Sequence, residues 1–416
     1  MRSTTALRIY VSLFLATTAR GDVNWNETHD QALRAFRDNQ FEIAESLFRK
    51  SAELARQPDE QATTANDLGV LLHYSLRNRE AKTALTQALT LWQKLGRKDA
   101  AARSAHSLGT VLRALGEYQE SERIMRQALA TQPGRPIDSA LLTIALADLL
   151  REEGHVEEAR NFAQVTLQMP GLSWRPIVDA TVIIADIDRE ARHYQASLDG
   201  WTKVLSESRA HNDATIEAVA LRGLGETALM MGDRAAAEPS LRKSLAYFET
   251  VQNKHQTAAT LNCLAELYIA EGKPAMADEA LRRAVDLDEA VIGPTHPQIA
   301  VMLQLRADAA IRLGAFPRAK ADMERAWSIL RVRFGDESPV AGAFLANRGM
   351  LLERSGNNAD AAADYERAAG ILRNGGQETL QLRTILMEHY AVVLRALHRK
   401  DQAKAALAEA KSFRHQ

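Results

Sequence analysis

The chain has 416 residues, of which 46% are hydrophobic and 25% are charged, and its 52 basic and 53 acidic residues nearly cancel. This composition excludes a disordered chain and leaves no global electrostatic attraction to DNA, RNA or anionic lipid. The single cysteine, Cys263, excludes an internal disulfide framework and a cysteine-rich zinc or iron–sulfur site.

The first twenty residues differ from the rest of the chain. Arg2 and Arg8 precede the apolar stretch 9–16, and the small residues Thr17 and Ala19 follow it. This order is typical of a secretory signal, and the apolar stretch is far shorter than the ~20 residues of a membrane-spanning helix. We therefore expect residues 1–20 to be a cleaved signal peptide, the protein to be periplasmic or secreted, and no integral membrane segment. The alternative is an amphipathic or disordered N-terminus on a cytoplasmic protein.

From residue 24 onward, apolar residues recur at helical spacing between short polar turns. A small residue returns at intervals of 37 to 42 residues, and we place it in the second helix of ten helical pairs: Ala44, Ala81, Ser121, Ala159, Ser197, Ala237, Ala277, Ala319, Ala361 and Ala403. Twelve residues before each stands an Ala or Gly of the first helix: Ala32, Gly69, Gly109, Ala147, Ala185, Gly225, Ala265, Ala307, Gly349 and Ala391. We call these twenty positions the small-residue markers. Because small side chains let two helices approach closely, they predict ten helical hairpins.

Two more positions belong to the repeat. A larger side chain four residues after most second-helix markers is expected to fill the remaining space, as at Leu85, Trp201, Leu241 and Tyr365. Glycines five residues before these markers are expected to end the first helix in a left-handed conformation: Gly116, Gly154, Gly232, Gly272, Gly314 and Gly356. The copy around 183–204 has Arg192 instead, which leaves a kink or a change of register open there.

The segment Leu108-Gly109, Gly116-Glu117-Tyr118, Ala128 and Pro133 follows the small and large pattern of the tetratricopeptide repeat, which this chain resembles over residues 24–413. The last third, with its 42-residue period and the turn 293–297 (Gly-Pro-Thr-His-Pro), resembles the kinesin-light-chain-like subclass. The resemblance implies an all-α, right-handed superhelical solenoid of about ten hairpins. We expect it to be continuous from 24 to 413, with the last helix as a cap.

The sequence shows no convincing set of catalytic residues. There is no nucleophile paired with a base, no phosphate-binding glycine cluster, and no H-E-x-x-H pair among the 11 histidines. We therefore expect no enzyme activity, no cofactor, no metal and no small-molecule substrate. For Cys263, packing in a helix is a better explanation than reactivity.

The resemblance implies that the first helices line a concave groove that holds peptides or partner helices. The residue after the first-helix marker is acidic in five consecutive repeats: Asp148, Asp186, Glu226, Glu266 and Asp308. This acidic track would attract a basic or donor-rich segment. The alternative is a solvated helix face, in which Arg151 and Arg189 pair with the acid three residues earlier.

Three asparagines near the markers offer hydrogen bonds to a bound backbone, although a plain polar surface role is the alternative for each: Asn66, Asn262 and Asn347. A carboxylate clamp of the kind found in some relatives would need a lysine four residues before the acidic positions. None of the five repeats has one, so that chemistry is not expected.

The sequence thus favours a non-enzymatic protein–protein interaction scaffold whose partner is a protein or peptide, basic if the acidic track is used, and not a nucleic acid. The alternative is a cytoplasmic sensory or regulatory module that acts on a separate effector chain. A hydrolase with a site assembled from dispersed residues has no positive support.

Overall fold

The computed structural model describes residues 24–38, 40–75, 77–373 and 379–413. The predicted signal peptide, residues 1–20, lies outside the described residues. The described part divides into two compact units, one reaching to Val111 and the other beginning at Leu112. The prediction of one continuous stack from 24 to 413 therefore stays a prediction across this boundary.

The first unit contains four helices and most of a fifth, α5, which crosses the boundary: α1 (Trp25–Arg37), α2 (Phe41–Leu54), α3 (Pro58–Tyr74), α4 (Asn78–Lys94) and α5 (Lys98–Ala114). The helices that follow belong to the second unit: α6 (Tyr118–Ala130), α7 (Pro136–Glu152), α8 (Val156–Gln168), α9 (Trp174–Glu190), α10 (Tyr194–Ala210), α11 (Ala214–Met230), α12 (Arg234–Thr250), α13 (Lys254–Ala270), α14 (Pro274–Ile292), α15 (Pro297–Arg312), α16 (Phe316–Phe334), α17 (Pro339–Arg354), α18 (Asn358–Leu372), α19 (Leu380–Ala396) and α20 (Lys400–Phe413).

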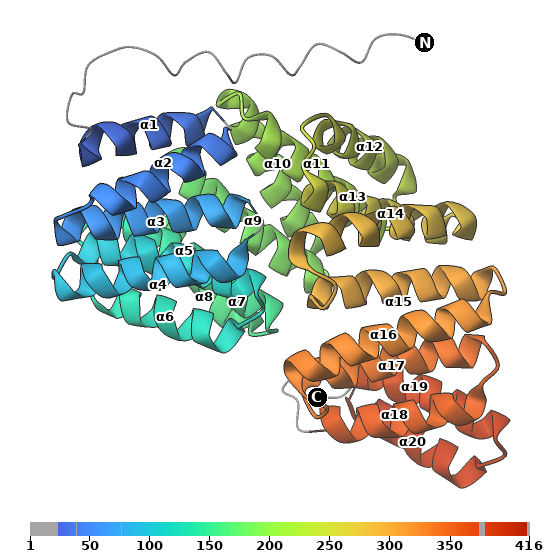
Figure 1. Cartoon of the computed structure of the whole chain (residues 1–416). Helices are drawn as coiled ribbons and strands as arrows, with labels where there is room; N and C mark the ends of the chain where they lie inside the picture. The colour runs from blue at the N-terminus through green and yellow to red at the C-terminus, as the bar shows by residue number, and fades with distance from the viewer. Residues whose placement is uncertain (1–23, 39, 76, 374–378, 414–416) are drawn as a thin grey trace, which may run out of the picture. The chain divides into compact units, whose positions relative to one another are not determined.

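Within each unit, the helices form a row of hairpins (Figure 1). From α1 to α4, and again from α6 to α20, each helix packs on the next one along the chain. No strand occurs in the residues that the structure describes, so the predicted all-α repeat architecture is confirmed. Across the same residues, none of the helices is long and apolar enough to cross a membrane.

The small-residue markers are the contact points between paired helices, as predicted. All twenty are buried, and every second-helix marker is at most 1% exposed. At Gly225 an added Cβ would lie 2.7 Å from Cγ of Leu241, and at Gly349 it would lie 2.5 Å from Cε1 of Tyr365. The predicted larger side chains therefore occupy the space that the markers leave, which fixes the register of the repeat.

The turns between paired helices take the predicted left-handed conformation. The six turn glycines have φ between 72° and 84°. Arg192 adopts φ 63° at the same place, and the markers Ala185 and Ser197 on either side are fully buried. That repeat keeps its register without a glycine, at the modest cost of a non-glycine residue in this region.

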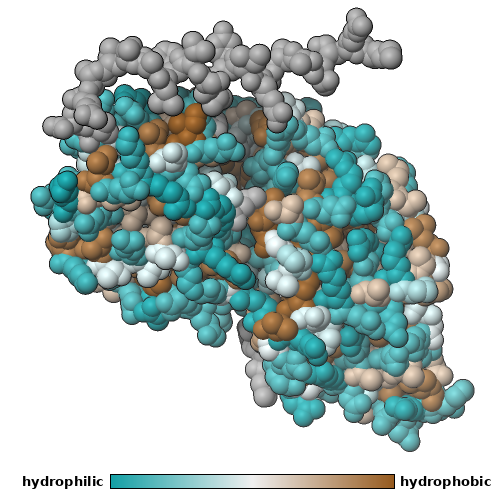
Figure 2. Space-filling view, viewed as in Figure 1, coloured by the Kyte–Doolittle hydropathy of each residue, from teal (hydrophilic) through white to brown (hydrophobic). Residues whose placement is uncertain are grey.

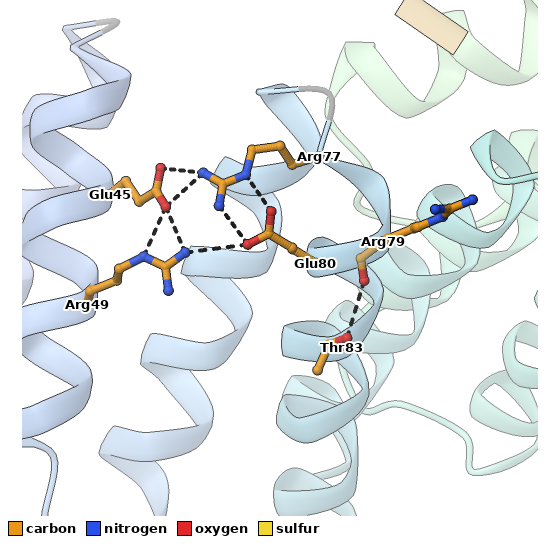
Figure 3. Close-up of polar contacts among 6 residues, drawn as sticks. All are labelled: Glu45, Arg49, Arg77, Arg79, Glu80 and Thr83. Carbon is orange, nitrogen blue, oxygen red and sulfur yellow. Dashed lines mark hydrogen bonds and ion pairs between the residues drawn. The ribbon is translucent and has the colours of Figure 1, made fainter. Parts of the chain in front are cut away.

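Charged side chains join neighbouring hairpins at the surface. In the first unit, Arg77 lies between Glu45 of α2 and Glu80 of α4, with a shortest distance of 2.7 Å to Glu45 and 2.6 Å to Glu80, and Arg49 completes the cluster (Figure 3). Exposed ion pairs contribute little, so burial of the hairpin faces is the main source of stability. On the face shown in Figure 2, hydrophilic side chains cover most of the surface and hydrophobic ones lie in small groups.

Candidate peptide-binding groove

A cavity of about 580 Å³ lies within the second unit, against the first helices of its repeats. Four of these helices, α7, α9, α11 and α13, contribute its floor. The start of α15 and the end of α16 contribute most of the remaining wall, together with single residues of α6, α10 and α17. The resemblance placed a groove on the first helices, and the cavity of this unit lies there. Its volume is in the range of sites that enclose a small ligand or a short peptide segment.

One side of the cavity is bridged by a contact between distant repeats. The guanidinium of Arg333, near the end of α16, lies 4.4 Å from the ring centroid of Tyr118, the first residue of α6. The ring of Phe334 lies 6.1 Å from the same tyrosine, and both rings line the cavity. A cation held over an aromatic face contributes about 0.5–2 kcal/mol, so this contact helps to hold the groove closed.

The predicted acidic track is largely neutralised in its first half. Arginines alternate with the carboxylates, and most of them join an acid of their own helix to an acid of the next first helix. The pairs are Arg113–Asp148, Arg151–Asp148 at 3.3 Å, Arg151–Glu190 at 2.8 Å, Arg189–Asp186 at 3.0 Å and Arg189–Glu226 at 3.0 Å. The solvated-face alternative anticipated the two pairs within a helix. The pairs between helices have partners about forty residues apart, which the repeat pattern alone does not supply.

The alternation of charge ends at α11 and α13. The position three residues after the acid is Arg151 in α7 and Arg189 in α9, whereas it is Leu229 in α11 and Ile269 in α13. Glu226 therefore shares Arg189 with Asp186. Within the part of the chain that the structure describes, Glu266 accepts a hydrogen bond only from Asn262, at 3.2 Å, and pairs with no cation. The unmatched negative charge of the cavity is concentrated at these two carboxyls.

The protonation equilibria reflect this imbalance. Burial, followed by the charge of Glu226, raises the pKa of Glu266 to about 7. Burial also raises the pKa of Glu226, although Arg189 opposes the shift. A positive charge brought into the cavity would stabilise the ionised form of both carboxyls, because it offsets their desolvation and their mutual repulsion.

Four polar atoms of the residues that line the cavity have no hydrogen-bond partner among the described residues. Two are the Nε atoms of Arg151 and Arg189, whose other guanidinium nitrogens pair with carboxylates. The other two are Nε1 of Trp201, whose side chain is 3% exposed, and Oδ1 of Asn262. The indole lies against Gly223 of α11, where an added Cβ would be 2.1 Å from the ring. The sequence analysis identified Trp201 as a core residue only. Gly223 was the sequence signal of this contact, because no other repeat has glycine two residues before the first-helix marker.

The structure brings some of the predicted groove residues together and not others. Asp186, Glu226, Glu266 and Asn262 line the cavity, and Asp148 pairs with Arg151 at its edge. Asp308 does not line it and pairs with Arg312 and Arg354 at 3.0 and 2.7 Å. The other two lie elsewhere: Asn347 is exposed on α17, and Asn66 belongs to the first unit, where it accepts a hydrogen bond from Ser104.

The raised pKa of Glu266 predicts how a charge-removing variant changes stability with pH. The protonated form favours the folded state, so this contribution is present below the ordinary pKa of 4.5 and is lost as the pH rises through about 7. Glu266→Gln should therefore be more stable than the parent at pH 8, by about 2 kcal/mol, and equal to it below pH 4.5. Urea denaturation at both pH values measures this difference. Glu190→Gln, whose carboxylate already pairs with Arg151, should show no such gain, and an equal gain in both variants would contradict the assignment.

Comparison with known proteins agrees with the repeat geometry. The sequence profile of the tetratricopeptide repeat matches residues 60–133 and 256–331. The chain therefore contains tetratricopeptide repeats. A search of the curated proteins found no match to this tetratricopeptide-repeat chain.

Several solved structures resemble this tetratricopeptide-repeat protein. A Rap protein complexed with Competence and Sporulation Factor is 18% identical, with a TM-score of 0.57, and the similarity covers 93% of this chain and 99% of the other. The Rap protein shares the fold. BtubC (BKLC) from P. vanneervenii is 19% identical, with a TM-score of 0.46 over 53% of this chain and 91% of the other. The TPR-like repeats of a kinesin light chain from Podosopora anserina are 19% identical, with a TM-score of 0.40 over 47% and 93%.

Proposed function

We propose that this protein is a non-enzymatic interaction scaffold that binds a cationic peptide segment of a partner protein in the cavity of the second unit. The observation that carries the proposal is the carboxyl pair Glu226 and Glu266, with one shared cation between them, in a cavity against the first helices. Binding by a preformed surface needs no catalytic step. The fold shared with a Rap protein that is complexed with Competence and Sporulation Factor supports the same kind of function.

The charge of the site supports a cationic ligand over an anionic one. Three arginines line the cavity: Arg151, Arg189 and Arg222. The first two have carboxylate partners, and the third donates a hydrogen bond to Oε1 of Gln256. An incoming anion would have to displace one of these contacts. An incoming cation would meet Glu266, which has no positive partner among its described contacts, and would relieve its repulsion with Glu226.

A serine, histidine and aspartate that lie together in the first unit do not support the hydrolase alternative. His29 contacts Asp67 at 3.0 Å and Ser51 at 3.2 Å. Ser51 is fully buried and also contacts Thr64 at 3.3 Å, so its hydroxyl has no access to a substrate carbonyl. This group is a buried polar network between α1, α2 and α3.

Selection from a phage-displayed library of random heptapeptides on the immobilised chain tests the proposal. We expect the selected peptides to bind through a positive charge and to bind more weakly as salt increases. Glu226→Gln combined with Glu266→Gln should weaken binding more than tenfold, whereas the control Glu279→Gln, on the exposed face of α14 outside the cavity, should leave it within about twofold. Failure to select any peptide, or equal binding by the parent and the double variant, would refute the function proposed for this site.

We also propose, from residues 1–20, that the protein is exported. The N-terminal sequence of the protein isolated from its own host tests this: cleavage after Ala19 or nearby is the expected result. An intact Met1 in the soluble cytoplasmic fraction would favour the alternative, a regulatory module acting on a separate effector chain.

A further inference from the structure

Of the four unpartnered atoms in the cavity wall, two belong to arginines that already pair with carboxylates, and the other two differ in hydrogen-bonding character. Nε1 of Trp201 is a donor, and Oδ1 of Asn262 is an acceptor. A buried polar group without a partner is costly, and native structures contain few of them. A ligand that offers an acceptor to Trp201 and a donor to Asn262 would satisfy both atoms. This requirement does not depend on the charges of Glu226 and Glu266.

Gly223 sets the place of the indole N–H relative to the carboxyl pair. The Cβ of any other residue at 223 would be 2.1 Å from Cε2 of Trp201, the ring carbon bonded to Nε1, so only glycine admits this edge of the ring against α11. Glu226 follows Gly223 by three residues, which is ~4.5 Å along a helix axis. The donor and the first carboxylate therefore lie about one helical turn apart.

The other side of the site offers a ligand acceptors, because Nδ2 of Asn262 already donates to Glu266 and leaves Oδ1 without a partner. Asn262 and Glu266 are four residues apart on α13, and so share one face of that helix. The packing of α11 on α13 places Glu226 beside them. Cys263 also lines the cavity, and its pKa is raised by burial first and then by the charges of Glu226 and Glu266. Two carboxylates and one amide oxygen match the three donors of a primary ammonium, whereas a guanidinium has five donors in a rigid fork.

We infer that the cavity captures the free N-terminus of a peptide. The α-ammonium group lies among Glu226, Glu266 and Oδ1 of Asn262, and the carbonyl oxygen of the first peptide residue accepts a hydrogen bond from Nε1 of Trp201. In an N-terminal residue the ammonium nitrogen and this oxygen are within ~3.5 Å of each other, which suits one helical turn between their partners. A lysine ammonium is separated from its own carbonyl by four more carbons and does not fit both partners together. This inference rests on the proposed function and specifies its ligand.

Chemical blocking of the peptide N-terminus tests the inference. Heptapeptides selected on the parent chain would be synthesised with a free N-terminus, with an acetylated N-terminus, and acetylated with lysine added at the first position. We expect acetylation to weaken binding at least tenfold and the added lysine not to restore it. If both acetylated forms bind as tightly as the free form while the Glu226→Gln and Glu266→Gln double variant still binds weakly, the inference is wrong and the proposed function stands. If no peptide is selected, both are wrong.

Replacing the indole N–H tests the role of Trp201 without changing its shape. Benzothienylalanine at 201 has sulfur in place of the N–H and keeps the ring system, so the chain should melt at the parent temperature. We expect it to bind the free peptides about three- to tenfold more weakly. The acetylated peptides should bind this variant no more weakly than they bind the parent chain. Unchanged binding of the free peptides by a folded variant would contradict the contact with Trp201.

Discussion

Gly225→Leu is expected to lower the free energy of unfolding of the second unit by about 3 kcal/mol or more. The new Cβ would lie 2.7 Å from Cγ of Leu241 and 3.1 Å from the carbonyl oxygen of Ala237, and the rest of the side chain has no space between α11 and α12. Overpacking of this kind forces the helices apart. Urea denaturation followed by circular dichroism measures the loss, and amide exchange should place it mainly in the hairpins next to α11.

Gly370→Leu is the matched control. Gly370 is exposed near the end of α18, and an added Cβ there would meet nothing within 4 Å. Leucine favours the helix by up to ~1 kcal/mol over glycine, so this variant should be as stable as the parent or more stable. Equal melting of the Gly225 variant and the parent would show that the register of the sixth repeat is wrong.

Arg348→Met is expected to cost about 3–5 kcal/mol of unfolding free energy. Both carboxylate oxygens of Asp364 accept hydrogen bonds from Arg348, each at 2.6 Å, and the aspartate is only 7% exposed. Removal of the arginine leaves a buried charge without its partner. The guanidinium also lies over Trp327 and Phe344, at 5.5 and 5.7 Å from their ring centroids, so ring contacts are lost as well.

The double variant Arg348→Met and Asp364→Leu provides the control, because it removes the stranded charge together with its partner and should recover most of the lost stability. The preceding repeat has the same pair 42 residues earlier, Arg306 with Asp322 at 2.6 Å. Arg306→Met should therefore cost a similar amount of unfolding free energy. A cost below about 1 kcal/mol in both single variants would show that the pairs contribute as little as exposed ones.

The fold was predictable because the repeat places one steric requirement at the same position ten times. A marker must be small wherever two helices touch. The small-residue markers therefore determine the hairpins and their register without knowledge of any distant contact. The turn glycines were predictable for the same local reason. Arg192 shows the limit: a longer side chain tolerates the left-handed conformation when both flanking helices pack well.

The candidate site was predictable only in part. The positions of Glu226 and Glu266 follow from the repeat, but the neutralisation of Asp148 and Asp186 depends on arginines of neighbouring repeats. The spacing of charges along one helix says nothing about partners about forty residues away. The role suggested for Trp201 arises from a missing side chain at Gly223 in another helix, which is visible in the sequence only when the ten copies are aligned by their markers.

The contact of Arg333 with Tyr118 limits how this protein can change in evolution. Most repeat arrays gain or lose copies easily, because each unit touches only its neighbours. Here two residues 215 positions apart meet (333 − 118), so duplication or deletion of a single hairpin between them would carry the arginine a full repeat away from the tyrosine. Copy number is therefore constrained between α6 and α16, whereas hairpins beyond α16 can be added or removed without breaking this contact.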